Sequence, residues 1–173
     1  MTDHATQAGA SGTVSASLPD WSRERPTRFW DPGRRLLAAI RGYQRARTGW
    51  GRRWHVLCHR VWSVVTGAEI PLNAQIGGGL LIPHPNGIVI HPGVEIGPNC
   101  LIFQQVTLGS GKGGVPIIGG HVDIGAGAKI FGGVQIGDHA QIGANAVVIA
   151  DVPPGATAVG IPARIAGRDG DAT

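Results

Sequence analysis

His84 is the residue in this sequence best suited to acid–base chemistry. A histidine side chain exchanges protons near neutral pH and is the commonest general acid or base in enzymes. His84 lies in the segment Pro83-His84-Pro85-Asn86-Gly87, directly before the apolar stretch Ile88-Val89-Ile90. Taken alone, a histidine in such a segment is more often an exposed loop residue. The catalytic interpretation therefore depends on the elements that position His84.

An aliphatic residue recurs at every sixth position from residue 70 onward. The series is Ile70, Ile76, Ile82, then after a two-residue shift Ile90, Ile96, Ile102, Leu108, and after a four-residue shift Ile118, Ile124, Ile130, Ile136, Ile142, Val148. A period of six matches neither a helix nor the alternation of hairpin strands. It predicts a solenoid of short parallel strands in which three hexads, about 18 residues, form one triangular coil. The two shifts predict loops at corners. Solenoids often place function on such loops, and simple tolerance of length variation is an equal alternative.

Composition agrees with one folded solenoid and a distinct N-terminal part. The chain has 173 residues, 42% of them hydrophobic, and 29 glycines without a collagen-like period. The net charge is +4, yet 11 of the 15 basic residues lie between Arg23 and Arg60. All five tryptophans also precede residue 67. These changes in composition along the chain predict four parts: a disordered lead (1–19), a basic helical segment (20–67), the hexapeptide-repeat solenoid (68–155) and a C-terminal tail (156–173).

Neither the first residues nor the cysteine content indicates export. The first residues lack the basic and apolar parts of a secretory signal, and no uninterrupted apolar window reaches the roughly 18 residues of a membrane-spanning helix. Cys58 and Cys100 are too few and too far apart for a disulfide framework or structural zinc site. A cytoplasmic location with both thiols reduced is expected.

Three segments resemble the hexapeptide-repeat acetyltransferases, and most of all serine O-acetyltransferase and its shortened relatives. They are Ile88-Val89-Ile90, Val106-Thr107-Leu108-Gly109 and Val159-Gly160-Ile161-Pro162-Ala163-Arg164. The resemblance covers about residues 67 to 167. It implies a mainly β fold, a left-handed parallel β-helix with a short helical N-terminal cap. It further implies a homotrimer and acetyl transfer from acetyl-CoA, without a metal, to a hydroxyl at sites between subunits.

The resemblance also implies which residues act. His84 matches the family's catalytic histidine, which there belongs to an Asp-His pair, but Pro83 stands at the place of the aspartate. Val115-Pro116 stands where the family has a second histidine before proline, in a loop shorter here by about four residues. Because the family uses the missing groups largely for serine, the acceptor is left open as serine, a sugar or another hydroxylated metabolite.

The hexad register predicts a column of residues along one edge of the solenoid. The positions two places after Ile82, Ile102, Ile124 and Ile142 are His84, Gln104, Ala126 and Ala144. Three coil steps span about 14 Å, comparable to an extended pantetheine arm. Neutral His84 would take the proton of the acceptor hydroxyl and later protonate the departing thiolate.

Other positions complete the predicted site. Asn86, His91 and Gln104 are candidate acceptor contacts, although a structural corner residue is the alternative for His91. The candidate cofactor contacts are Gly109, Ala126, Lys129, Ala144 and Arg164. Backbone N–H groups of the 109–114 corner are candidate donors to the reacting oxygen, and Arg164 is a candidate phosphate ligand. For the two alanines simple coil packing is an equal alternative.

Two other function classes remain open. His121 and His139 fall one coil apart, about 5 Å, but without a third ligand a solvent-facing ladder is favoured over a metal pair. A zinc lyase of the carbonic anhydrase type would need three converging histidines, and the spacing of His84, His91 and His121 does not resemble that pattern. A non-catalytic solenoid scaffold is the other alternative.

The basic segment predicts two amphipathic helices, over 32–47 and 51–66, which would cover the first coil of the solenoid. Such a cap protects an open strand edge. The alternative for these arginine- and tryptophan-rich helices is a peripheral membrane contact. No recognised nucleic-acid-binding module occurs, so no nucleic acid partner is expected.

Overall fold

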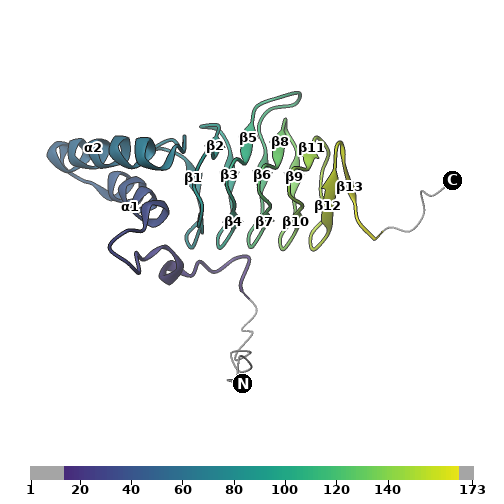
Figure 1. The fold of residues 1–173 in the computed structure, drawn as a ribbon, viewed down its shortest axis with the longest axis horizontal. Coiled ribbons are helices and arrows are strands. Elements are labelled where there is room, and N and C mark those ends of the chain that lie inside the picture. Colours follow the sequence, from purple (N-terminus) through teal and green to yellow (C-terminus); the bar gives the residue numbers. More distant parts are fainter. Residues whose placement is uncertain (1–13, 168–173) are drawn as a thin grey trace, which may run out of the picture.

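The computed structural model describes residues 14–167, which form a helical N-terminal part followed by a parallel β-solenoid (Figure 1). The helical part contains η1 (Trp21–Glu24), α1 (Pro32–Arg45) and α2 (Gly49–Thr66). Asp31 and Thr48 are the N-caps of α1 and α2, and their side chains accept from the backbone N–H of Arg34 and Gly51. Gly67 ends α2 in the left-handed conformation, at φ 63°, which glycine adopts without steric cost.

The solenoid consists of two- to four-residue strands on three flat faces. Face A holds β2 (Val89–Ile90), β5 (Thr107–Gly109), β8 (Lys129–Phe131) and β11 (Val147–Val148). Face B holds β1 (Gln75–Ile76), β3 (Glu95–Ile96), β6 (Ile117–Ile118) and β9 (Gln135–Ile136). Face C holds β4 (Leu101–Ile102), β7 (Asp123–Ile124), β10 (Gln141–Ile142), β12 (Thr157–Gly160) and β13 (Ala163–Ile165).

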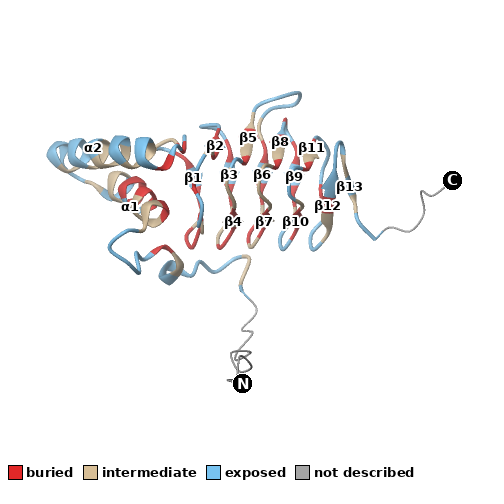
Figure 2. Ribbon diagram, viewed as in Figure 1, coloured by how far each residue is buried: buried red, intermediate tan, exposed pale blue. Residues whose placement is uncertain are grey.

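The predicted hexads are the inward positions of these strands. On face A, Ile90, Leu108, Ile130 and Val148 are parallel register partners. All are at most 2% exposed. Figure 2 shows buried residues recurring in each successive coil. Cys100, predicted to lie in the core, is fully buried. The parallel β-helix and its N-terminal helices are therefore confirmed.

Only α1 covers the first coil closely. Leu36, Leu37 and Ile40 of α1 are at most 1% exposed and belong to the same core as the solenoid. In α2 only Thr66 is buried. The predicted cap is thus mainly one helix, and α2 packs outside it.

A buried ion pair joins α1 to the first coil. The Arg41 guanidinium donates to both Glu24 carboxylate oxygens, at 3.0 and 2.9 Å, and to the carbonyl oxygens of Ile76 and Gly77, both at 2.7 Å. Glu24 Oε1 also accepts from the backbone N–H of Gly79 and Leu80. Because every strong polar group here has a partner, the pair offsets much of its desolvation cost.

Two predicted boundaries are corrected by the structure. Residues 14–19, assigned to a disordered lead, lie against the solenoid because the Asn99 amide donates to the carbonyl oxygens of Ser15 and Leu18 at 2.7 and 2.8 Å. Residues 1–13 lie outside the described part. The solenoid also continues into the assigned tail: β12 pairs in parallel with β10, and β13 closes that edge as an antiparallel partner of β12. Residues 168–173 also lie outside the described part.

We predict that Glu24→Ala lowers the free energy of unfolding by about 3–5 kcal/mol, because it leaves the buried Arg41 guanidinium without its counter-charge. Asp31→Ala, which removes a more exposed pair with Arg34 and a helix cap, should cost only about 1 kcal/mol. Urea unfolding followed by circular dichroism measures both. Equal losses in the two variants would contradict the structural role given to the Glu24–Arg41 pair.

Candidate functional site

His84 lies in the corner between face C and face A, on the two-residue insertion predicted there. Its side chain is exposed, as is that of Asn86, whereas Pro85 between them is buried. The Pro85 carbonyl accepts from the Ile88 backbone N–H at 3.2 Å, and the Gly87 N–H donates to the Gly67 carbonyl at 3.0 Å. The corner is therefore anchored around His84, and the imidazole is left accessible to a substrate.

The predicted column is corrected at its first member. The Gln105 N–H donates to the Asn86 carbonyl at 2.8 Å, in the same way that the Gly127 N–H donates to Gln104 and the Asn145 N–H to Ala126. The aligned residues are therefore Asn86, Gln104, Ala126 and Ala144. The prediction that His84 starts this column is wrong, because the inserted residues place it two positions earlier in the corner.

A shallow groove of about 240 Å³ runs along face C beside this column. It is lined by Leu101, Phe103, Asp123, Gly125, Gln141, Ile142, Gly143 and Thr157. A Cβ atom on Gly125 would lie 2.6 Å from the Ala144 nitrogen, so a side chain there would force the coils apart. Sequence reasoning missed the groove. Its wall is formed by the outward-facing residues that directly precede the buried isoleucines of face C, such as Leu101, Asp123 and Gln141.

Gln104 provides an unused acceptor next to the groove. Its side-chain oxygen is buried and has no hydrogen-bond partner among residues 14–167. A buried acceptor without a donor is costly, and native proteins rarely leave one unsatisfied. A donor from outside the described chain can reach this buried oxygen only if the Gln104 side chain turns outward.

Lys129 lies on face A and its ammonium group is already bound. The Nζ atom donates to the Gln105 carbonyl at 2.5 Å and to Thr107 Oγ1 at 3.1 Å. These bonds hold the cation close to the corner that carries the Asn86 column. A role toward a cofactor phosphate stays a prediction.

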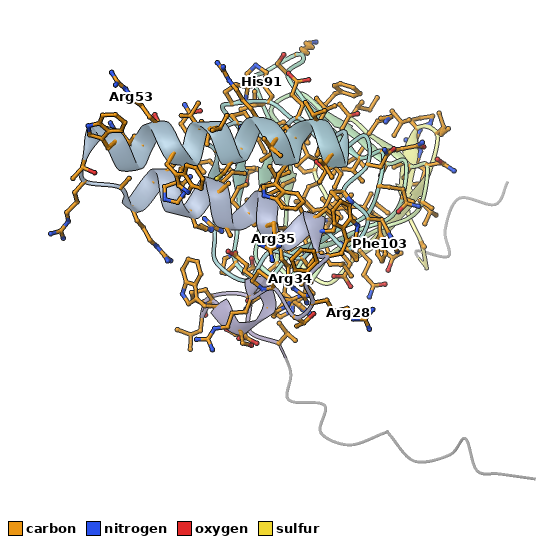
Figure 3. All side chains as sticks on the ribbon, turned by 60° about the vertical axis from the view of Figure 1, so that its left-hand side comes forward. Arg28, Arg34, Arg35, Arg53, His91 and Phe103 are labelled. Atoms are coloured by element: carbon orange, nitrogen blue, oxygen red, sulfur yellow. The ribbon has the colours of Figure 1, made fainter. Side chains whose placement is uncertain are left out.

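Gly109 and His91 lie at the far end of face A, in the corner toward face B. In the loop after Gly109 the N–H groups of Gly111 and Gly114 donate to each other's carbonyls, at 2.9 and 3.2 Å, so these two predicted oxyanion donors are occupied. His91 Nδ1 accepts from the Gly93 N–H at 3.2 Å. Figure 3 shows His91 well apart from Phe103 of the groove. One chain does not bring these residues to His84.

Arg164 extends face C beyond the groove. It lies on β13 opposite Val159 of β12, and its side chain is exposed. The only hydrogen bond of that side chain among the described residues is donated by Nη1 to the Ala163 carbonyl, at 3.2 Å. Arg164 and the groove therefore share one face, as the predicted phosphate contact requires.

The two aligned histidines form a ladder at the corner between faces B and C. The Nδ1 atoms of His121 and His139 are 2.8 Å apart and their ring centroids are 5.0 Å apart. Within residues 14–167 no group of three or more metal-ligating side chains occurs. The two imidazoles therefore contact each other as an aligned pair near the surface, and the absence of a bound metal stays a prediction.

No family model matches the chain, but individual proteins do. The chain is 46% identical over 112 residues to the serine acetyltransferase of Synechococcus elongatus, covering 62% of this chain and 46% of that protein. Among solved structures, a serine acetyltransferase in complex with CoA matches at a TM-score of 0.69 and 35% identity, over 79% of this chain and 58% of that one. The serine acetyltransferase of Neisseria gonorrhoeae in complex with serine matches at a TM-score of 0.68 and 37% identity, over 78% of this chain and 57% of that one.

The hexad register and the three-faced coils define a hexapeptide-repeat solenoid protein. Within this class, the chain is similar in sequence and in fold to serine acetyltransferases, as the resemblance of the repeat motifs predicted. The chain spans about half the length of the curated relatives that it matches. The match covers 46% of the length of one of them and 41% of the length of another.

We predict that Cys100 is inert in the folded protein, because burial raises the pKa of its thiol to about 11 and leaves almost no thiolate at neutral pH. A thiol reagent should modify only Cys58, which is half-buried, before unfolding and both cysteines afterwards. Mass spectrometry of the labelled protein counts the adducts, with Cys58→Ser as control. Rapid double labelling of the native protein would contradict the burial of Cys100.

Proposed function

We propose that this protein is an acetyl-CoA-dependent O-acetyltransferase that acetylates a hydroxyl group of a small molecule. The observation that carries the proposal is the similarity to the CoA-bound serine acetyltransferase over 79% of this chain at 35% identity. Serine is the first acceptor to test, because the relatives are named for it.

His84 is the proposed general base. Its exposed imidazole, in the neutral form, takes the proton of the acceptor hydroxyl as that oxygen bonds to the acetyl carbon. The bond between the carbonyl carbon and sulfur then breaks, and the same proton is returned to the CoA thiolate. The imidazole ends as it began, so no covalent enzyme intermediate is required.

The face C groove is the proposed place for acetyl-CoA, which supplies the activated acetyl group. Its glycine floor lets an extended chain lie close to the backbone. The Gln104 side chain, once turned outward, can offer its unpaired oxygen to an amide N–H. Arg164 farther along the same face is suited to a phosphate. Small side chains at Ala126 and Ala144 leave that path open.

A homotrimer with sites between subunits fits this arrangement. His84 occupies a convex corner that encloses nothing, whereas transfer to a small hydroxyl requires exclusion of competing water. A neighbouring copy can supply the missing wall, and it can bring the opposite corner with His91 and Gly109 to the histidine. Asn86, beside His84, is then a candidate acceptor contact. Sedimentation velocity tests this assembly, and a monomer as the active species would contradict it.

We predict that His84→Ala lowers the rate of thiol release from acetyl-CoA by about 10² to 10⁴-fold, because proton removal from the acceptor is lost. Binding of CoA, measured by calorimetry, should be unchanged. His139→Ala removes an exposed histidine at another corner and should retain full activity. A His84→Ala rate within a few-fold of wild type would refute the assigned base.

An acceptor panel tests the substrate class. L-serine, homoserine and a set of sugars are compared with the same thiol assay. Turnover with serine shows that the relatives' acceptor is kept despite Pro83 and Val115, and turnover only with another hydroxyl names a different acceptor. No turnover together with no CoA binding favours the scaffold.

We predict that Ala144→Trp raises the KM for acetyl-CoA at least about tenfold with a smaller change in kcat, since the indole fills the path beside the groove and removes binding shared by ground and transition states. His139→Trp, an exposed position at the corner between faces B and C, is the matched control. An unchanged KM in Ala144→Trp would place the cofactor elsewhere.

A further inference from the structure

Helix α2 carries a continuous apolar stripe that nothing in the described structure covers. The stripe consists of Trp50, Trp54, Leu57, Val61 and Val64, which are 82%, 62%, 55%, 50% and 84% exposed. Alternating steps of four and three residues place all five on one side of a helix. Figure 2 shows α2 exposed over nearly its whole length, in contrast to α1.

The opposite side of α2 attaches it to the protein. His59 Nε2 lies 2.8 Å from the Ile70 carbonyl oxygen, and Trp62 packs against the core. The stripe therefore lies on the outer side of α2, and only Trp54 also borders α1, at a pocket that it lines with Ala38 and Ala39. Its exposure follows from how the helix is docked, because turning it inward would expose these attached residues instead.

Further exposed aromatic side chains lie beside α2, next to the side that attaches the helix to the protein. Trp30 packs edge-on against Trp62 with ring centroids 6.0 Å apart, and Trp30 and Phe29 are 64% and 90% exposed. An apolar surface of this extent on a single chain marks an interaction site.

The charges on the two helices are of one sign. Residues 32–66 contain eight arginines and no aspartate or glutamate. Of the carboxylates that flank the helices in sequence, Glu24 and Asp31 are paired with Arg41 and Arg34, and the exposed Glu69 lies three residues after the end of α2. Arg53 and Arg60 fall along one edge of the stripe by helical spacing. Figure 3 shows Arg53 pointing away from the body of the protein near the start of α2.

We propose that the α2 stripe binds the surface of an anionic lipid bilayer. A helix that lies in the membrane interface has Trp and Leu on its buried face and arginines that reach the headgroups. Tryptophan favours this boundary because its ring is apolar and its N–H is polar. No helix within residues 14–167 is long and apolar enough to cross a membrane, so the contact is with the surface.

Charge favours the lipid surface over a second copy of the chain. The spacing of the stripe would suit a helix pair, but a second copy would bring more arginines and no free carboxylate from the two helices to neutralise them. Anionic headgroups supply the missing negative charge, and each arginine near such a surface adds to binding.

Vesicle cosedimentation with the full chain tests the proposal. The probes are vesicles of phosphatidylcholine alone and of phosphatidylcholine mixed with phosphatidylserine. The protein should bind the mixed vesicles and not the neutral ones, and added salt should release it. Because Trp50 and Trp54 are exposed, binding should also shift tryptophan emission to shorter wavelength.

Two variants separate the contributions of the stripe and its charges. Leu57→Glu/Val61→Glu should weaken binding at least about tenfold, because it places carboxylates in the apolar face. Arg53→Gln/Arg60→Gln should weaken binding to the mixed vesicles about 30-fold while changing only exposed side chains. Ile149→Glu is the matched control and should bind as wild type. Circular dichroism checks that each variant is folded.

Three outcomes would overturn the proposal. One is the absence of binding to either vesicle by the wild-type protein. Another is equal binding by the wild type and both double variants. The third is a wild-type protein that binds no vesicles and whose mass in sedimentation velocity is larger than that of Leu57→Glu/Val61→Glu. That result would assign the stripe to contacts between copies of the chain.

Discussion

The structure depends on the stacking of aliphatic side chains inside the coils. Each strand is only a few residues long and would not persist alone, but the parallel pairing of one coil on the next aligns the inward residues in closed columns. Burial of those columns supplies the main favourable free energy, and the backbone bonds between coils fix their register. An error of one residue would turn an aliphatic residue outward, so the corners must absorb every insertion.

The corners are therefore where the chain can vary and where its chemistry lies. The insertion before Gly87 exposes His84 without disturbing the columns on either side. The insertion after Gly109 builds a loop at the other end of the same face. A convex corner presents a side chain well but encloses little, and this makes neighbouring copies a natural source of the remaining walls.

The N-terminal part solves a different problem, the open end of the first coil. Helix α1 covers it with apolar residues and ties it down through Arg41 and Glu24. Helix α2 contributes little to that cover, and its apolar stripe remains exposed on its outer side. The division separates the helix that stabilises the solenoid from the helix available to an outside surface.

The six-residue period in the sequence determined the solenoid, its core residues and its corner loops, because the period reflects which side chains must be buried. The motif around His84 likewise singles out that residue from the sequence alone. Tertiary structure alone decided that Asn86, and not His84, is aligned with Gln104, because counting residues cannot tell where in a corner an insertion bulges. It also decided that residues 14–19 lie on Asn99, that face C carries a groove, and that α2 leaves its apolar stripe exposed. These features arise from contacts between segments far apart in sequence, which no local pattern records.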